Sequence, residues 1–126
     1  MKLSSWTISR SLIRNLMQAA KHVYPDEFIA LLSVTPEHPH VLSQFVVVPA
    51  EFGRTHSQLR EDLIPTDPLI AGTVHSHPSP SARASEQDLI AFSRLGEIHL
   101  ILAYPYNETS FRAYSASGKS RTIPLV

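Results

Sequence analysis

The sequence feature that most constrains the fold is an apolar run that ends in two histidines and leads through a short loop into a helix. Leu69 to Val74 predicts a buried strand, and His75 and His77 follow it directly. After a Pro- and Ser-rich stretch, Ser85 and Asp88 have the three-residue spacing of a capping box at a helix start. Alternate residues of an extended segment point to the same side. Both imidazoles can therefore face one point, and the helix start can bring the Asp88 carboxylate back towards it.

Two neutral imidazoles and one carboxylate make a three-ligand shell of the kind found at catalytic zinc, with the fourth position open for water. The chain has no cysteine, so any metal here must be held by His, Asp or Glu. Each part of the pattern is weak alone, because a His-x-His pair is more often structural and Ser85 with Asp88 needs no role beyond capping. Their combination at the end of a buried strand, where ligands commonly gather in α/β sheets, favours a metal site.

Glu27 is the candidate for a carboxylate base. A zinc-bound water profits from a carboxylate that is not itself a ligand, and Glu27 follows Pro25 at the start of an otherwise apolar strand. Taken alone, Glu27 is more simply explained as an exposed residue at a strand end. A zincin would show His-Glu-x-x-His on one helix, and that pattern is absent. The base and the metal ligands must therefore come from separate elements.

Two main helices are expected. In the first, apolar residues recur at helical spacing from Ile8 to Val23, with Thr7 or Ser9 as the cap and a proline as the stop. The second begins at Ser85, and Gly96 is its expected stop. The first helix has no residue pattern that indicates more than packing against a core.

The remaining apolar runs predict one sheet. The expected strands are 27–34, 41–48, 69–74, 98–104, 110–116 and 122–126, with the first two as a hairpin. The polar, irregular stretch 49–68 leaves room for a short helical piece around Ser57 to Leu63. The strand at 98–104 is nearly continuous in apolar residues, which indicates burial on both faces. The sum is an α/β fold of the α+β kind, a central mixed β-sheet flanked by two main helices.

Composition and charge narrow the class of protein. The 126 residues make one domain, and a hydrophobic content of 43% is that of an ordinary globular protein. Eleven basic residues balance eleven acidic ones, so the totals show no basic footprint of nucleic-acid binding. We therefore expect no nucleic-acid partner.

The sequence also bears on the compartment. No apolar run approaches the ~20 residues of a membrane span, and Arg10 and Arg14 interrupt the apolar core that a signal peptide would need. Residues 1–24 are Ser-rich and basic with no acidic residue, which is also the composition of a mitochondrial presequence, but they run without a break into Pro25. We expect a cytoplasmic protein with no membrane partner.

The separate signals combine into one pattern. In chain order they are Glu27, then His75-x-His77-Pro78, then Ser85-x-x-Asp88. This combination closely resembles the JAMM metalloprotease signature of the MPN domain family, and the flanks at 25–32 and 71–74 are similar too. The chain departs from the family pattern at Ala30, where Gly is common, and at Ala84, where Pro is common. The resemblance implies one JAMM/MPN domain over residues 1–126, with cytidine-deaminase-like layering.

The resemblance also implies an activity, that of a zinc isopeptidase. It implies that His75, His77 and Asp88 bind one catalytic Zn²⁺. It implies that Glu27 is the general acid/base, which assists attack by a zinc-bound water, and that Ser85 stabilises the oxyanion. The implied substrate is the peptide or isopeptide bond at the C-terminus of a ubiquitin-like or sulfur-carrier small protein. A chain of this size resembles small prokaryotic members, and a homodimer stays open.

Two other functions stay open on the sequence alone. A non-enzymatic MPN scaffold could hold a metal or a partner without turnover. A metal phosphoesterase built on His-x-His would need further ligands, and the remaining candidates lack ligand-like spacing: His22, His56 and His99. His38 and His40 lie in a proline-studded turn and are best explained as solvated loop residues.

Overall fold

The computed structural model of the chain describes residues 5–47, 50–52, 57–59 and 67–126. Its elements in chain order are β1 (Thr7–Ile8), α1 (Arg10–Val23), β2 (Ile29–Ser33), β3 (Val41–Leu42), β4 (Gln44–Val46), β5 (Ala50–Phe52), β6 (Ser57–Leu59), β7 (Ile70–His77), α2 (Glu86–Phe92), β8 (Ile98–Ala103), β9 (Phe111–Ser115) and β10 (Ser120–Arg121).

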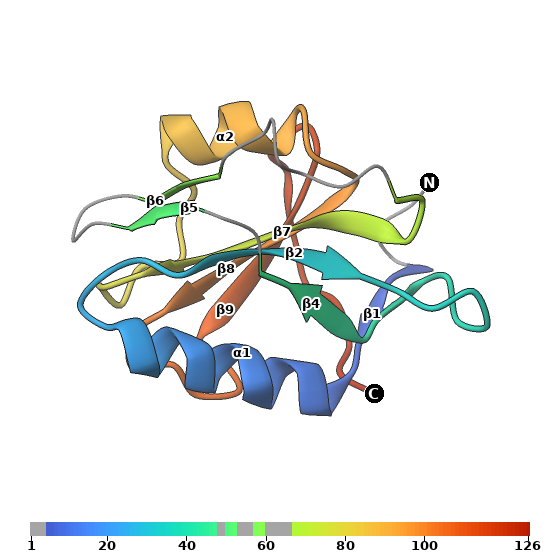
Figure 1. Ribbon diagram of the computed structural model, residues 1–126, viewed down its shortest axis with the longest axis horizontal. Coiled ribbons are helices and arrows are strands. Elements are labelled where there is room, and N and C mark those ends of the chain that lie inside the picture. The colour runs from blue at the N-terminus through green and yellow to red at the C-terminus, as the bar shows by residue number, and fades with distance from the viewer. Residues whose placement is uncertain (1–4, 48–49, 53–56, 60–66) are drawn as a thin grey trace.

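Six of these strands form the central sheet, in the order β10-β9-β8-β7-β2-β4. β7 and β8 run parallel, and the other neighbours run antiparallel. α1 covers one face of this sheet and α2 lies on the other (Figure 1). The predicted fold class, a mixed sheet between two main helices, is confirmed.

α1 starts at the residue that caps it. Ser9 is extended (φ −61°, ψ 132°), and its hydroxyl accepts a hydrogen bond from the Leu12 N–H at 3.2 Å. Ile8 therefore lies outside the helix, contrary to the predicted helical stripe, and pairs with Leu42 in the short parallel ladder of β1 and β3. The helix ends at Val23, shortly before a proline, as predicted.

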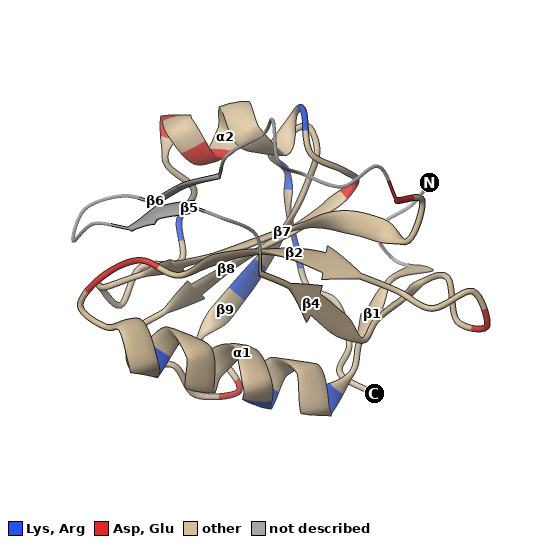
Figure 2. Ribbon diagram, in the orientation of Figure 1, with Lys and Arg blue, Asp and Glu red and all other residues tan. Residues whose placement is uncertain are grey.

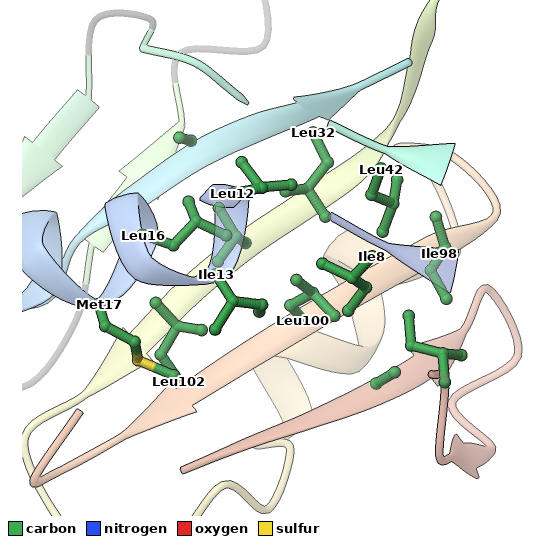
Figure 3. Close-up of a cluster of buried hydrophobic side chains, with 14 of the residues drawn as sticks. Ile8, Leu12, Ile13, Leu16, Met17, Leu32, Leu42, Ile98, Leu100 and Leu102 are labelled. Carbon is green, nitrogen blue, oxygen red and sulfur yellow. The ribbon is translucent and has the colours of Figure 1, made fainter. Parts of the chain in front are cut away.

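The main core lies between α1 and the sheet. The side chains that α1 buries are Leu12, Ile13, Leu16, Met17 and Ala20. They belong to the same buried cluster as Leu32 of β2 and Leu100 and Leu102 of β8 (Figure 3). Burying one such leucine contributes on the order of 2 kcal/mol. This core therefore fixes the central strands, whose ends carry the predicted site.

The short strands depart from the predicted pattern. The expected strand 41–48 is divided, so that β3 pairs with β1 and β4 forms the antiparallel partner of β2. The helical piece expected around Ser57 to Leu63 is wrong at its start, because 57–59 form β6 and pair with β5. The rest of that piece lies outside the described residues. The closing strand is β10 and not 122–126. β2, β7, β8 and β9 are confirmed with shifted ends.

The close approach of β7 and β8 requires Gly72. The parallel register runs from Gly72 opposite Ile98 to His77 opposite Ala103. A Cβ atom at Gly72 would lie 1.5 Å from the Ile98 carbonyl oxygen, so a side chain there would push the strands apart. This pairing delivers both predicted ligand histidines to the C-terminal end of a strand inside the sheet.

Residues of both charge signs are spread over the helices, strands and loops (Figure 2). On α1, the guanidinium groups of Arg10 and Arg14 approach the Glu108 carboxylate at 3.7 and 3.1 Å. Exposed pairs of this kind add little stability, but they partly neutralise the basic residues of α1. In the described parts of the chain, no helix is long and apolar enough to cross a membrane.

Candidate metal centre and catalytic groups

Two elements bring the predicted ligands together. β7 ends in His75 and His77, and α2 starts after the capping residue Ser85 and carries Asp88 in its first turn. α2 ends before the expected stop at Gly96, whose positive φ of 119° belongs to the turn that follows. The helix is therefore shorter than predicted, but its start, which matters for the site, is confirmed.

The Asp88 carboxylate is the centre of this cluster. Its Oδ2 accepts the Ser85 N–H at 2.8 Å and lies 3.1 Å from His77 Nε2, and its Oδ1 lies 3.5 Å from His75 Nδ1. In return, Ser85 Oγ accepts the Asp88 N–H at 3.1 Å, which completes the predicted capping box. Burial alone would raise the pKa of Asp88, but its bonds to His77 and Ser85 and the charge of His75 lower it to about 2. The carboxylate is therefore ionised at neutral pH.

The nitrogen of His77 that faces this carboxylate is Nε2, and in the neutral ring it is an acceptor. Its Nδ1 lies 3.1 Å from the Ser81 carbonyl oxygen, which can only accept, so Nδ1 carries the hydrogen. In the neutral ring, Nε2 then directs a lone pair at Asp88 Oδ2, 3.1 Å away. A proton or a metal ion between the two atoms satisfies both. Burial lowers the pKa of His77, but the hydrogen bond and charge of Asp88 outweigh it and raise this pKa.

His75 is held neutral. Burial lowers its pKa to about 4, against the opposing charge of Asp88. Its Nε2 is buried and has no hydrogen-bond partner among the described residues. The Phe92 ring lies edge-on to the imidazole, with 6.2 Å between ring centroids. A buried nitrogen without a partner is unusual in proteins. The ring nitrogen that lies nearest to the Asp88 carboxylate is the other one, Nδ1.

Glu27 is placed beside His77 by strand register. At the start of β2, the Phe28 N–H donates to Ser76 Oγ at 2.7 Å, and the Ser76 N–H donates to the Phe28 carbonyl at 2.9 Å. The paired register ends at Ile29 opposite His75, and these bonds extend it to Phe28 and Ser76. Continued by one more residue, the register puts Glu27 opposite His77. In agreement, the charge of Glu27 contributes to the raised pKa of His77. The structure thus brings the predicted base to the predicted ligands.

Ser85 is exposed at the edge of the cluster. Its oxygen accepts the Asp88 N–H, so its hydroxyl hydrogen can point outward. Ser85 is therefore the predicted helix cap, and its hydroxyl hydrogen is free to point toward solvent.

The donor set fits zinc in kind. Two imidazoles and a carboxylate are usual ligands, and a carbonyl such as that of Ser81 is the usual outer partner of a metal-binding histidine. The lone pair of His77 Nε2, which faces Asp88 Oδ2, is one that a cation would satisfy. As they stand, the His, Asp and Glu side chains of the described residues form no group of three arranged to hold a metal ion. The ligand roles stay predictions.

Two residues that the sequence did not single out hold the ligand strand. Ser76 is fully buried and bonds the backbone of Phe28. Tyr106 is also buried, has a positive φ of 62°, and donates its hydroxyl to the His77 carbonyl at 2.8 Å. The position of Ser76 between two histidines could have identified it. Tyr106 gives no such signal, because its contact with β7 bridges two distant segments.

The remaining histidines lie away from this cluster or outside the described residues. His22 and His38 are exposed, and His56 lies outside the described residues. His40 was expected to be solvated, but it is half-buried, with its ring edge-on to Trp6 at 5.2 Å between centroids. That expectation is therefore wrong for His40.

His99 of β8 is a buried structural residue. Its Nε2 donates to the Gly96 carbonyl at 3.0 Å, so its Nδ1 accepts from the Thr73 hydroxyl at 2.7 Å. Its ring stacks on Phe92, with 4.4 Å between centroids. Burial lowers the pKa of His99 to about 4, so the folded chain holds it neutral.

The free energy of unfolding is expected to fall as the pH falls from 6.5 to about 4. The unfolded chain takes up a proton at His99 with the ordinary pKa of 6.5, whereas the folded chain takes it up only near pH 4. Protons therefore favour unfolding across this window, by roughly 3 kcal/mol for such a shift. Urea titrations at several pH values check this result. The His99→Gln variant has no titrating group at this position, so its free energy of unfolding should depend much less on pH. The buried His75 accounts for a remaining dependence. A pH dependence equal to that of the wild type would contradict the assignment to His99.

Comparison with known proteins gives one consistent family. Residues 9–116 match the Prok-JAB family, described as prokaryotic homologues of the JAB domain. A protein of Haloferax volcanii named "Probable metalloprotease" is 27% identical over 118 residues, which cover 87% of this chain and 73% of that protein.

Solved structures agree with this match. A JAB1/MPN domain protein from Archaeoglobus fulgidus is similar with a TM-score of 0.76 and 38% identity, over 98% of each chain. A structure described as a JAMM metalloprotease-like zinc site in the proteasome and signalosome has the same TM-score and identity, over 96% of this chain and 97% of that one.

Proposed function

Because the chain belongs to the family of prokaryotic homologues of the JAB domain, we propose that it is a zinc-dependent metallopeptidase. Its proposed reaction is hydrolysis of the peptide or isopeptide bond at the C-terminus of a ubiquitin-like or sulfur-carrier small protein. The observation that carries the proposal is the meeting of His75, His77 and Asp88 in one corner beside Glu27. The names of the Haloferax relative and of the JAMM zinc structure support the metal-dependent class.

The proposed zinc ligands are His75, His77 and Asp88. When bound there, zinc supplies a Lewis acid that polarises a carbonyl and lowers the pKa of a water molecule to about 7. The chain orients its ligands in advance, since the Ser81 carbonyl fixes the ring hydrogen of His77. The capping box likewise fixes the Asp88 carboxylate against the start of α2. Such outer contacts strengthen metal binding.

Glu27 is the proposed general base and acid. The continued register opposite His77, and the effect of the Glu27 charge on the pKa of His77, support a carboxylate beside the proposed ligands that is not itself one of them. Glu27 takes a proton from the attacking water and returns it to the leaving amine. The Ser85 hydroxyl is the proposed donor to the negative charge that develops on the carbonyl oxygen, and its exposed position allows this contact.

The substrate is proposed to reach the site as an extended polypeptide tail. The paired strands β5 and β6 stand on the same side of the sheet as α2 (Figure 1), and β6 contacts β2. An extended tail can pair with a strand edge of this kind by strand addition.

The proposal is tested by incubating the chain with a linear fusion of a ubiquitin-like protein to a fluorescent reporter. We expect cleavage at the end of the ubiquitin-like part, loss of cleavage with a zinc chelator, and recovery when zinc is added back. Metal analysis of the same sample measures bound zinc. Stoichiometric zinc without cleavage of any carrier fusion or conjugate would favour the non-enzymatic MPN scaffold. Cleavage that persists after complete removal of zinc would contradict the role of the metal.

A further inference from the structure

Tyr114 of β9 holds the loop that leads from the histidines to α2. Its hydroxyl donates to the Ala82 carbonyl at 2.8 Å and accepts the Ala84 N–H at 3.1 Å. Tyr114 is only 4% exposed, so water does not readily replace these bonds. One phenolic oxygen therefore ties a carbonyl and an N–H of the loop to the central sheet.

The Tyr114 ring contacts the helix that follows this loop. It packs on Phe92 of α2 with 5.5 Å between centroids, in a small buried cluster with Ile101. Phe92 in turn lies edge-on to the imidazole of His75. The same tyrosine thus contacts the loop through its hydroxyl and the helix through its ring, and both segments carry groups of the candidate metal centre.

The loop contact lies next to the ligand turn. Ala84 precedes Ser85, whose N–H donates to Asp88 Oδ2 at 2.8 Å, the oxygen that lies 3.1 Å from His77 Nε2. The bond from the Ala84 N–H to the Tyr114 hydroxyl therefore lies one residue before the Ser85 N–H that holds Asp88.

We propose that Tyr114 is a positioning residue of the metal centre, whose hydroxyl sets the turn at 82–85 and through it the direction of the Asp88 carboxylate. This inference rests on the proposed function, because its consequence is a zinc site that is ordered before the metal binds. Without the hydroxyl, the Ala84 N–H and the Ala82 carbonyl lose their partner in a partly buried place. The turn can then move, and Asp88 spends less time in the ligand position.

The Tyr114→Phe variant tests this role, because it keeps the ring and removes only the hydroxyl. We expect zinc to bind about tenfold more weakly, the lower end of the effect of losing an outer partner of a ligand. We expect kcat on the fusion of a ubiquitin-like protein to the fluorescent reporter to fall. KM should stay unchanged, because Tyr114 is buried and does not contact the substrate. In the metal-free chain, amide hydrogen exchange at Ala84 and Asp88 should become faster.

Ile13→Val is a matched control for a small loss of core packing. Ile13 is fully buried on the other face of the sheet, so its variant should keep zinc affinity, kcat and the exchange at Ala84. Wild-type zinc affinity or wild-type exchange in Tyr114→Phe would overturn the inference. A wild-type chain that binds no zinc would overturn the proposed function instead. In that case the exchange of the metal-free variant still decides whether the hydroxyl holds the turn.

Discussion

Replacement of Glu27 by glutamine is expected to abolish turnover and to leave zinc bound. Glutamine has the same size, but its amide cannot take up a proton from water and return it to the leaving amine. Glu27 is also not one of the three proposed ligands, so the metal shell stays complete. A general acid–base group contributes roughly 10²–10⁴ in rate, so kcat should fall at least about 100-fold. The measurement is kcat on the carrier fusion, with zinc affinity of the same sample by competition with a chelating dye.

Asp26→Asn is the matched control for this change. It removes a neighbouring carboxylate from the same connection between α1 and β2 and should retain most activity. Full activity of Glu27→Gln would exclude Glu27 as the base. Joint loss of zinc and turnover would instead make Glu27 part of the metal shell. Joint loss differs from the expected result in the zinc measurement alone, so that measurement separates a catalytic base from a metal ligand.

The meeting of the proposed ligands His75, His77 and Asp88 could be predicted from the sequence because local structure sets most of their relative positions. His75 and His77 face one way because they alternate on a strand, and Ser85 and Asp88 face each other because of the capping box. Glu27 needed more information. Its neighbours in the sequence do not distinguish a base from an ordinary strand-end residue, and the antiparallel register of β2 on β7 places it opposite His77. The resemblance to a known motif supplied that non-local link.

The parts that were not predicted depend on contacts between distant segments. Ile8 fits the apolar spacing of α1, but the Ser9 cap and the pairing with Leu42 put it in a strand. The residues of the short strands β6 and β10 favour neither helix nor strand. Their extended conformation depends on pairing with β5 and β9. Tyr114 fits an ordinary strand position, and its hydroxyl finds partners 30 and 32 residues earlier in the chain. No sequence period encodes such a contact.

Replacement of Asp88 by asparagine is expected to remove zinc and turnover together. The asparagine oxygen can still accept the Ser85 N–H, so the capping box and α2 can persist. The change removes the negative charge and puts an NH2 group, which has no lone pair available for a metal, in place of one carboxylate oxygen. Loss of an outer partner alone weakens metal binding 10–100-fold, so loss of a charged ligand should weaken it at least about 100-fold. Zinc titration measures the affinity, and circular dichroism checks that the fold is retained.

Glu86→Gln is the matched control, because it removes an exposed carboxylate from the same first turn of α2. Unchanged zinc affinity in this variant would assign the effect of Asp88→Asn to the ligand and not to the charge of the helix. Glu27→Gln and Asp88→Asn then separate the two halves of the site, since the first keeps zinc and loses turnover while the second loses both. An Asp88→Asn chain that binds zinc as tightly as the wild type would remove Asp88 from the shell. The 3.1 Å approach of His77 Nε2 to Asp88 Oδ2 would then be explained by a shared proton and not by a shared metal ion.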